Sequence, residues 1–304
     1  MESSKSIVIL GCGYVGAAMA EQALARGMHV IALTRNADKA AGLRAKGVQC
    51  VVEADLGSDD WHTQIEPRQD YVFNCVSSGG GGLDGYRKSY VAGQQSLLRW
   101  AAKGNIGTVI YTGATSVYSQ SDGEIVDEDS TSGDLSPSGE ILLEAEKVLS
   151  EGAAAAKIAR WFVLRLGGIY GPGRHYLLDK LRAGETAFPG SGDFYVNMIH
   201  RDDIVSAAFA LFQSPEVIKD RIYNLVDGDY PSKSEMVEWL ADRLSVGKPH
   251  FDPSQSMNRE GRRRNTEGKL PNRRVSTERI RSELNWKPTY PSFRDGYEEI
   301  LAGS

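Results

Sequence analysis

Short apolar segments alternate with longer segments of helical periodicity through the first half of the chain. The apolar segments lack the alternation of half-exposed strands, which is typical of parallel strands covered by helices on both faces. The pattern predicts strands at Ile7–Leu10, His29–Leu33, Val48–Val52, Tyr71–Val76, Thr108–Tyr111 and Trp161–Leu166. It predicts helices at Val15–Ala25, Asp38–Lys46, Tyr86–Lys103 and Glu140–Gly152. Because single helices separate successive strands, we expect an α/β fold with a Rossmann-type doubly wound parallel sheet.

A glycine-rich turn, Gly11-Cys12-Gly13-Tyr14-Val15-Gly16, joins the first predicted strand to the first predicted helix. In that context the pattern G-x-G-x-x-G indicates dinucleotide binding. Gly11 permits the tight turn, Gly13 lets the backbone approach a pyrophosphate, and Gly16 lets the helix pack closely on the sheet. The helix N-terminus adds N–H groups for the phosphates. We expect Gly11, Gly13, Tyr14, Val15 and Gly16 to contact the cofactor; a glycine turn without a ligand is the alternative.

The alternation of strands and helices stops after Leu166, where Gly- and Pro-containing turns separate shorter elements. The later elements are expected to be helices at Asp203–Phe212, Ser234–Leu244, Thr277–Leu284 and Phe293–Leu301, a strand at Ile222–Val226, and a loop at Pro249–Asn272. We assign residues 1–166 to an NAD(P)-binding Rossmann core. Residues 167–304 are expected to complete that core and to form a smaller C-terminal lobe that binds substrate.

The end of the second predicted strand bears on the choice between NAD and NADP. Proteins that bind the free ribose 2′-OH carry Asp or Glu roughly 20 residues after the glycines, whereas this chain has Thr34-Arg35-Asn36 there. Since Arg35 can pair with a 2′-phosphate, we favour NADP and keep NAD as possible. A solvated loop position is the alternative for Arg35. Asp55, just beyond the third strand, either accepts from the adenine amino group or caps the helix after it.

Composition excludes several classes of protein. The chain has 35 basic and 40 acidic residues, a net charge of −5, which excludes a nucleic-acid-coating protein and gives no pull toward anionic membranes. It contains no apolar run of about 18 residues, the length needed to span a bilayer. Its three cysteines form no metal or disulfide pattern, and the N-terminus leads into a strand rather than a signal peptide. We therefore expect a cytoplasmic protein without a bound metal.

Motifs along nearly the whole chain resemble the extended short-chain dehydrogenase/reductase superfamily, the NAD(P)-dependent epimerase/dehydratase group, and especially its atypical members. The matching stretches are the glycine motif, Asp55-Leu56, Tyr86 to Leu98, Ser116-Val117-Tyr118, Leu164 to Gly173, Ile199 to Asp203, Arg274-Val275-Ser276 and Trp286-Lys287-Pro288. Further candidate cofactor contacts are Thr34, Leu56, Val76, Ser77, Gly168 and Ile169.

The resemblance also indicates that this chain lacks residues that usually form the catalytic site of the family. Family members usually carry Ser or Thr four residues before the Tyr of the Val-Tyr pair, and Tyr-x-x-x-Lys at the start of the next helix. There the ammonium lowers the pKa of the phenol, which then serves as acid or base. In this chain Ala114 stands at the Ser/Thr position, and Ser138 and Leu142 align with the Tyr and Lys. We expect the usual catalytic pair to be absent.

Other groups are candidates for the chemistry. Thr115, Ser116, Tyr118 and Tyr170 are the candidate catalytic hydroxyls, with packing as the alternative for the two tyrosines. His200 is expected to make structural hydrogen bonds. The basic residues of the late loop either form a solvated segment or attract an anionic substrate. They are Arg259, Arg262, Arg263, Arg264, Lys269, Arg273 and Arg274.

The function expected from these features is that of an NAD(P)-dependent oxidoreductase or epimerase/dehydratase-like enzyme with a non-standard active site. Its substrate would be a small polar metabolite. Val196 stands where nucleotide-sugar members of the family often carry a diphosphate-binding Arg, which lowers the chance of a nucleotide-sugar substrate. The alternative is a non-catalytic NADP(H)-binding sensor or scaffold. By resemblance, helices Tyr86–Lys103 and Glu140–Gly152 would form a homodimer interface. No nucleic-acid or membrane partner is expected.

Overall fold

The structure is a computed structural model that describes residues 4–255 and 269–303. The chain forms two compact units. Unit 1 comprises Met1–Ala114, Ser138–Arg165 and Ile204–Tyr223, and unit 2 comprises Thr115–Pro137, Leu166–Asp203 and Asn224–Ser304. Each unit is therefore built from separate stretches of sequence, whereas the sequence pattern divides the chain once, near residue 166.

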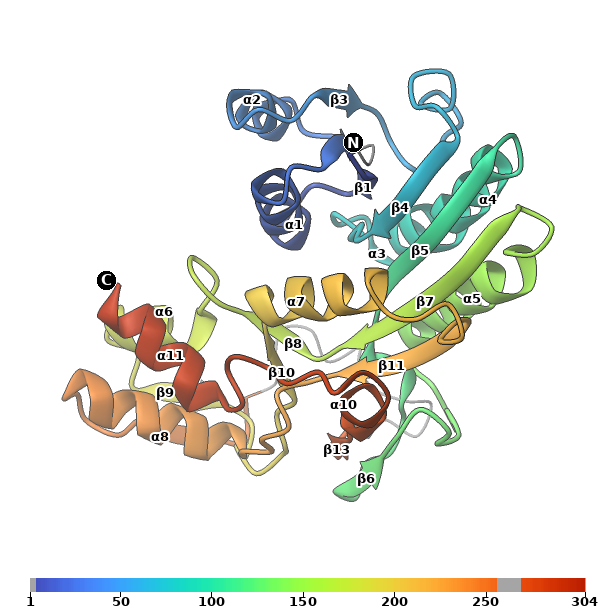
Figure 1. Cartoon of the computed structure of the whole chain (residues 1–304). Helices are drawn as coiled ribbons and strands as arrows, with labels where there is room; N and C mark the ends of the chain where they lie inside the picture. Colours follow the sequence, from blue (N-terminus) through green and yellow to red (C-terminus); the bar gives the residue numbers. More distant parts are fainter. Residues whose placement is uncertain (1–3, 256–268, 304) are drawn as a thin grey trace. The chain divides into compact units, whose positions relative to one another are not determined.

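The centre of unit 1 is a seven-stranded sheet with the order β11-β7-β5-β4-β1-β2-β3 (Figure 1). Its strands are β1 Ser6–Leu10, β2 His29–Thr34, β3 Cys50–Glu53, β4 Arg68–Asn74, β5 Asn105–Ala114, β7 Ile158–Leu166 and β11 Arg221–Leu225. The pairs β1–β2, β1–β4, β2–β3 and β4–β5 are parallel. The predicted Rossmann-type doubly wound sheet is confirmed. Its strand order reverses between β1 and β4, the place where such sheets bind ligands.

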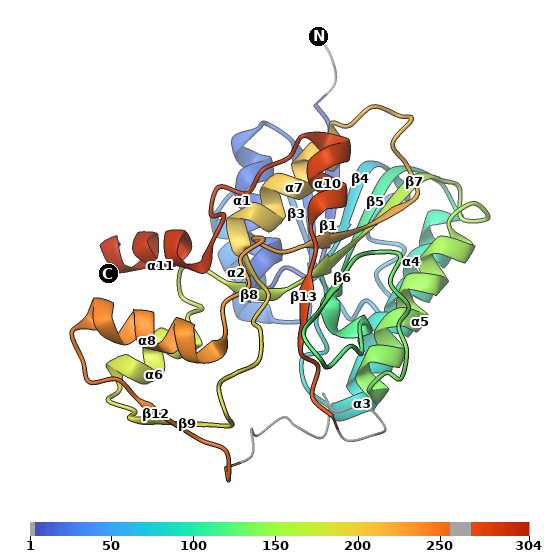
Figure 2. The same ribbon diagram turned by 90° about the horizontal axis from the view of Figure 1, so that it is seen from below.

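Helices cover both faces of this sheet. They are α1 Tyr14–Ala25, α2 Ala37–Ala45, α3 Gly82–Tyr86, α4 Gly93–Ala101, α5 Pro137–Gly152 and α7 Arg201–Phe212. In Figures 1 and 2, α4 and α5 lie on one face of the sheet and α1 and α7 on the other. Beneath α4 and α5 the apolar core includes Trp61, Trp100 and Tyr111, all fully buried. The indole N–H groups of Trp61 and Trp100 donate to backbone carbonyls, which satisfies them in this core.

The helix predicted at Tyr86–Lys103 differs from the observed one. It begins earlier, with α3, and Arg87–Ala92 between α3 and α4 form a π-helical segment, η1. Single π turns inside α-helices occur frequently at functional sites. The helix predicted at Glu140–Gly152 includes Pro137 as its first residue, a position that suits proline because its missing N–H would have no partner within the helix there.

Unit 2 consists of short elements. They are η2 Thr115–Val117, β6 Glu124–Val126, β8 Gly168–Tyr170, α6 Tyr176–Arg182, β9 Ala187–Pro189, β10 Met198–His200, α8 Lys233–Leu244, β12 His250–Asp252, β13 Arg273–Val275, α10 Glu278–Leu284 and α11 Phe293–Ala302. The strands pair in parallel as β10–β8, β12–β9 and β13–β6. The loop predicted at Pro249–Asn272 is wrong at His250–Asp252, which forms β12, and residues 256–268 lie outside the described part.

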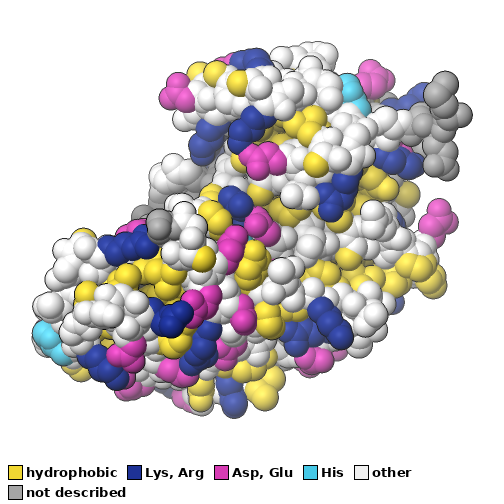
Figure 3. All heavy atoms as spheres, turned by 60° about the vertical axis from the view of Figure 1, so that its left-hand side comes forward, with side chains coloured by type: hydrophobic (Ala, Val, Ile, Leu, Met, Phe, Trp, Pro, Cys, Tyr) yellow, Lys and Arg dark blue, Asp and Glu magenta, His cyan; other side chains and the backbone are white. Residues whose placement is uncertain are grey.

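The surface carries charges of both signs. Lys and Arg side chains are interspersed with Asp and Glu over the face shown in Figure 3, in keeping with the small net charge of −5. Within residues 4–255 and 269–303, no helix has the length and apolar character needed to cross a membrane.

Candidate functional site

The glycine turn lies at the reversal of strand order. The Gly11 and Cys12 N–H groups donate to Leu33 O at the end of β2 (3.0 and 3.2 Å), and Cys75 N, after β4, donates to Leu10 O (2.8 Å). The turn therefore joins the carboxyl ends of β1, β2 and β4.

A side chain would have different consequences at each of the three glycines of the motif. Gly11 has φ +93°, and a Cβ there would lie 2.7 Å from the backbone N and Cα of Val76. A Cβ on Gly16 would lie 2.6 Å from Gly11 O. A Cβ on Gly13 would have only Gly11 O near it, at 4.0 Å. Packing within the chain thus requires glycine at 11 and 16, whereas position 13 borders open space, as a closely approaching ligand would need.

The N-terminus of α1 has no side-chain cap. Its N-cap residue is Gly13, and no acidic residue lies in its first turn. In contrast, Asn36 caps α2 by accepting from Lys39 N at 2.8 Å, and Ser232 caps α8. The N-cap residue and the first turn of α1 therefore place no negative side chain at the positive end of the helix dipole, which suits a pyrophosphate.

Arg35 and Asp55 lie together beyond β2 and β3. Arg35 Nη1 is 3.6 Å from Asp55 Oδ2, and its side chain is 46% exposed. Asp55 Oδ1 accepts from Gly57 N at 2.9 Å, so it caps a turn rather than a helix. Burial opposes ionisation of Asp55, but hydrogen bonds from Lys88 and Gly57 and the charges of Lys88 and Arg35 outweigh it and lower its pKa. Asp55 is therefore a carboxylate at neutral pH.

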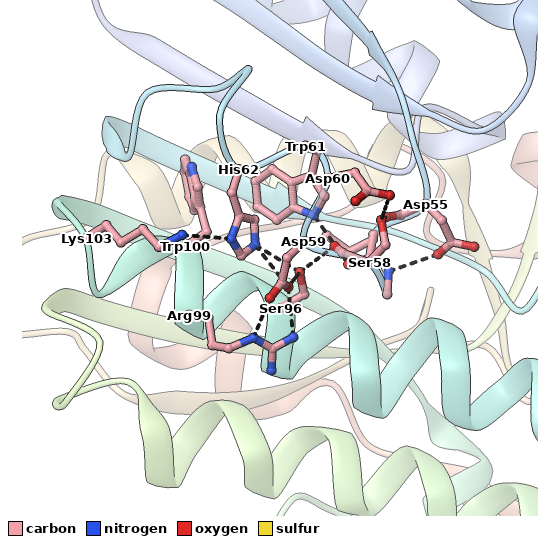
Figure 4. A network of polar contacts seen from close by, with 12 residues as sticks. Asp55, Ser58, Asp59, Asp60, Trp61, His62, Ser96, Arg99, Trp100 and Lys103 are labelled. Carbon is pink, nitrogen blue, oxygen red and sulfur yellow. Dashed lines mark hydrogen bonds and ion pairs between the residues drawn. The ribbon is translucent and has the colours of Figure 1, made fainter.

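A polar network anchors the segment after Asp55 to α4 (Figure 4). Asp59 accepts from Arg99 Nε and Nη2 at 2.9 and 2.8 Å and from Ser96 Oγ at 2.8 Å. The His62 ring is hydrogen-bonded to Ser96 Oγ at 3.0 Å through Nε2 and to Lys103 Nζ at 3.2 Å through Nδ1. Since the ammonium of Lys103 can only donate, Nδ1 accepts and Nε2 carries the proton. The network fixes the residues that follow Asp55, and so the position of Asp55 itself.

The other expected cofactor contacts are distributed over both units. In unit 1, Thr34 and Leu56 are buried, Val76 is half-buried and Ser77 is exposed. Gly168 and Ile169 belong to unit 2, in β8, where Gly168 N donates to Asn197 O at 2.7 Å. Their contact with a cofactor stays a prediction.

Thr115 and Ser116 form the first part of η2 and are half-buried. Thr115 O accepts from Tyr118 N at 3.2 Å and from Arg273 Nη2 at 2.5 Å. The sequence marks Arg273 only as part of a basic cluster, and its partner 158 residues away carries no signal that would have identified it. Arg274 Nε donates to Gly123 O at 3.0 Å, so both arginines hold backbone carbonyls. Of the same cluster, Arg259, Arg262, Arg263 and Arg264 lie outside the described residues.

Both candidate tyrosines are buried and hydrogen-bonded. Tyr118 donates to Asn224 Oδ1 at 2.8 Å, and Tyr170 donates to Ser292 O at 3.3 Å. Tyr170 lies in the apolar core of unit 2, and burial raises the pKa of its phenol far above the ordinary value. These positions favour packing roles for the two tyrosines. The half-buried hydroxyls of Thr115 and Ser116 are the more accessible candidates.

His200 is fully buried between the rings of Tyr170 and Tyr290. Its Nδ1 accepts from Asp202 N at 3.3 Å, the structural role expected from the sequence. Burial lowers the pKa of His200 from 6.5 to about 4. The imidazole is therefore neutral at physiological pH and is not a general acid there.

The depressed pKa of His200 predicts a loss of stability in acid. Below about pH 6.5 the unfolded state binds a proton on this residue and the folded state does not, so stability falls until about pH 4. The full difference is about 3 kcal/mol. In His200→Asn the amide oxygen replaces the Nδ1 acceptor without titrating. Between pH 6.5 and 4, urea unfolding should show the variant losing about 3 kcal/mol less than the wild type. Parallel pH profiles would contradict this prediction.

The face of α5 that carries Ser138 and Leu142, the residues aligned with the family's Tyr–Lys pair, is buried. Ser138 and Leu142 are 7% and 5% exposed, and Glu146 follows four residues later on the same face. Glu146 forms an ion pair with Arg165 of β7, with contacts of 2.7 to 3.1 Å. No group of three or more His, Cys, Asp or Glu side chains arranged to hold a metal occurs in the described ranges.

A family model described as the NAD dependent epimerase/dehydratase family matches residues 7–225. The chain belongs to this family. Membership confirms the resemblance drawn from the motifs and supports a nicotinamide-dependent enzyme; the loss of the Tyr–Lys pair stays a prediction.

Similar proteins match nearly the whole chain. Protein YeeZ of Escherichia coli (strain K12) is 27% identical over 292 residues, 94% of this chain and 97% of YeeZ. The structure of MoeE5 with UDP-glucuronic acid and NAD superposes with a TM-score of 0.82 at 20% identity, over 99% of each chain. UDP-glucuronic acid 4-epimerase of Bacillus cereus, solved with UDP-glucuronic acid and NAD, gives a TM-score of 0.81 at 18% identity, over 98% of this chain and 99% of the epimerase. At these identities the two structures establish the fold alone.

Proposed function

We propose that the chain is an NADP(H)-dependent oxidoreductase or epimerase/dehydratase-like enzyme that acts on a small polar metabolite. The observation that carries this proposal is the glycine turn, where Gly13 borders open space beside an uncapped helix N-terminus. MoeE5 and the Bacillus cereus epimerase were both solved with NAD, which supports a nicotinamide cofactor in the family. Arg35, in place of a carboxylate at the end of β2, favours NADP.

A bound nicotinamide would supply hydride transfer at its C4 position. The glycine turn and the α1 N-terminus would hold its pyrophosphate, and Arg35 its 2′-phosphate. Thr115 or Ser116, directly after Ala114, would present a hydroxyl to the substrate, and the Arg273–Thr115 hydrogen bond would fix that turn. A water molecule is a second candidate for the proton donor.

The choice of NADP predicts a clear effect of Arg35→Gln. A hydrogen bond to a charged group contributes about 1.5–3 kcal/mol, so the Kd for NADPH should rise about 10- to 100-fold, with the Kd for NADH unchanged. Titration followed by nicotinamide fluorescence measures both constants. Arg44→Gln is the matched control, because Arg44 is similarly exposed and pairs with Glu53 instead. If the wild type binds NADH more tightly than NADPH, the assignment of NADP as cofactor is wrong, but a dinucleotide-dependent enzyme is still supported. If it binds neither nucleotide, the proposed function is wrong.

A non-catalytic NADP(H)-binding sensor or scaffold is the second candidate, favoured by Ser138 and Leu142 at the positions of the catalytic Tyr and Lys. Exchange of label between NADPH and a panel of small carbonyl compounds separates the two candidates. Exchange above the protein-free rate supports the enzyme, whereas tight NADPH binding without exchange supports the sensor.

The proposed enzyme would be a cytoplasmic homodimer. The expected dimer helices are α4 and α5, but the large apolar side chains exposed in the described residues are Leu83, Ile125, Tyr176, Val217 and Val246. None of these lies in α4 or α5, so the proposed dimer rests on the family resemblance.

A further inference from the structure

Two cationic side chains contact one carboxylate near the carboxyl ends of β2 and β3 in unit 1. Lys88 Nζ lies 2.9 Å from Asp55 Oδ2, and Arg35 Nη1 lies 3.6 Å from the same oxygen. The three residues come from separate segments: the end of β2, the turn after β3, and the π-helical segment η1. Sequence patterns single out Arg35 and Asp55 but give no reason to select Lys88.

Glycines border both cations. A Cβ on Gly57 would lie 2.7 Å from Lys88 O and 3.3 Å from Lys88 Cγ, so glycine lets the turn after Asp55 approach the π segment. Gly79 has φ +63°, and its Cβ would stand 2.0 Å from Arg35 Nη2. A side chain at residue 79 would therefore take the place of the Arg35 guanidinium. The lack of a side chain at these two glycines therefore leaves room for Lys88 and Arg35 beside Asp55.

The charge of this cluster differs from that of neighbouring ion pairs. Each of three neighbouring ion pairs joins one cation to one carboxylate: Arg44 to Glu53, Arg87 to Glu144, and Arg99 to Asp59. Lys88, Arg35 and Asp55 together carry a surplus of one positive charge. A phosphomonoester carries about −1.5 to −2 at pH 7, so it would complement this surplus. An isolated ribose 2′-OH would not.

We infer that Lys88 is a second specificity-determining residue, which together with Arg35 binds the adenosine 2′-phosphate of NADP(H). This inference rests on the proposed NADP-dependent function. Arg35 offers a planar fork for two phosphate oxygens and Lys88 a mobile point charge. Asp55 holds both side chains near the phosphate position before the cofactor arrives, which lowers the entropy lost on binding.

The test is isothermal titration of the full chain with NADPH, NADH, adenosine 2′,5′-bisphosphate and adenosine 5′-monophosphate. In Lys88→Gln the Kd for NADPH and for the bisphosphate should rise about 10-fold, the effect of one charge-assisted contact. The Kd for NADH and the monophosphate should stay within about twofold. Lys88→Arg should keep most of the preference, because the positive charge remains.

Arg87→Gln is the matched control. Arg87 precedes Lys88 in the same π segment and is similarly exposed (56% against 61%), but it pairs with Glu144 of α5. If NADPH binding weakens equally in Arg87→Gln and Lys88→Gln, the effect is general electrostatics and the inference is wrong. If Arg35→Gln loses the NADPH preference and Lys88→Gln keeps it, Lys88 alone is excluded and the proposed function stands. If the wild type binds neither nucleotide, both fail.

Discussion

Replacing Arg165 with methionine is expected to lower the free energy of unfolding by about 3–5 kcal/mol. Arg165 and its partner Glu146 are 5% and 2% exposed, and three hydrogen bonds of 2.7 to 3.1 Å join them. Burial raises the pKa of Glu146 above its ordinary value even though Arg165 opposes the shift. Without the guanidinium, the carboxyl group must stay buried as an unpaired charge or take up a proton. Urea unfolding at pH 7 measures the loss.

The double variant Glu146→Leu, Arg165→Met is the control for lost packing. Replacing a whole buried ion pair with apolar residues is often neutral or stabilising, so the double variant should be much closer to the wild type than Arg165→Met. The deficit of the single variant should also shrink as pH falls, because Glu146 then becomes neutral. A single variant that loses less than about 1 kcal/mol would mean that solvent reaches Glu146.

The central sheet could be predicted because its information is local. Its strands contain short apolar runs, and β1, β2 and β4 are each followed by a helix whose periodicity the sequence shows directly. Ile7–Leu10 therefore appears almost unchanged as Ser6–Leu10. The three-residue strands of unit 2 could not be found in this way. Gly168–Tyr170 and Met198–His200 become strands only through their mutual pairing, and three residues are too few for a periodic pattern.

In the candidate site, too, the features that depend on local sequence could be predicted, and the contacts between distant residues could not. The glycine turn is contiguous in sequence. Its strand–turn–helix context explains why positions 11 and 16 require glycine. The contacts Lys88–Asp55 and Arg273–Thr115 join residues far apart in the chain, so neither appears in any local pattern. Arg165 did carry a signal, since a charged residue inside an apolar strand requires a buried partner. Its position alone could not name Glu146.

Gly16→Ala is expected to destabilise unit 1 and weaken dinucleotide binding together. A Cβ at residue 16 would lie 2.6 Å from Gly11 O and 3.0 Å from Cys75 Sγ. Because the oxygen belongs to the backbone, the glycine turn must shift away from α1. Overpacking of this kind costs about 1–3 kcal/mol, more than the roughly 1 kcal/mol that alanine contributes in a helix. Since the same turn would hold the pyrophosphate, we expect the Kd for NADPH to rise at least about 10-fold.

Gly42→Ala gives the matched control, with the same chemical change in the next helix of the same unit. No atom lies within 4 Å of a Cβ at Gly42, which is exposed within α2. Helix propensity then acts alone and should stabilise the protein by about 1 kcal/mol without changing NADPH binding. Thermal unfolding and NADPH titration of the two variants separate helix propensity from turn geometry. If Gly16→Ala instead matches Gly42→Ala in both measurements, the turn tolerates a side chain, and the close approach of α1 to Gly11 is not what forms the phosphate site.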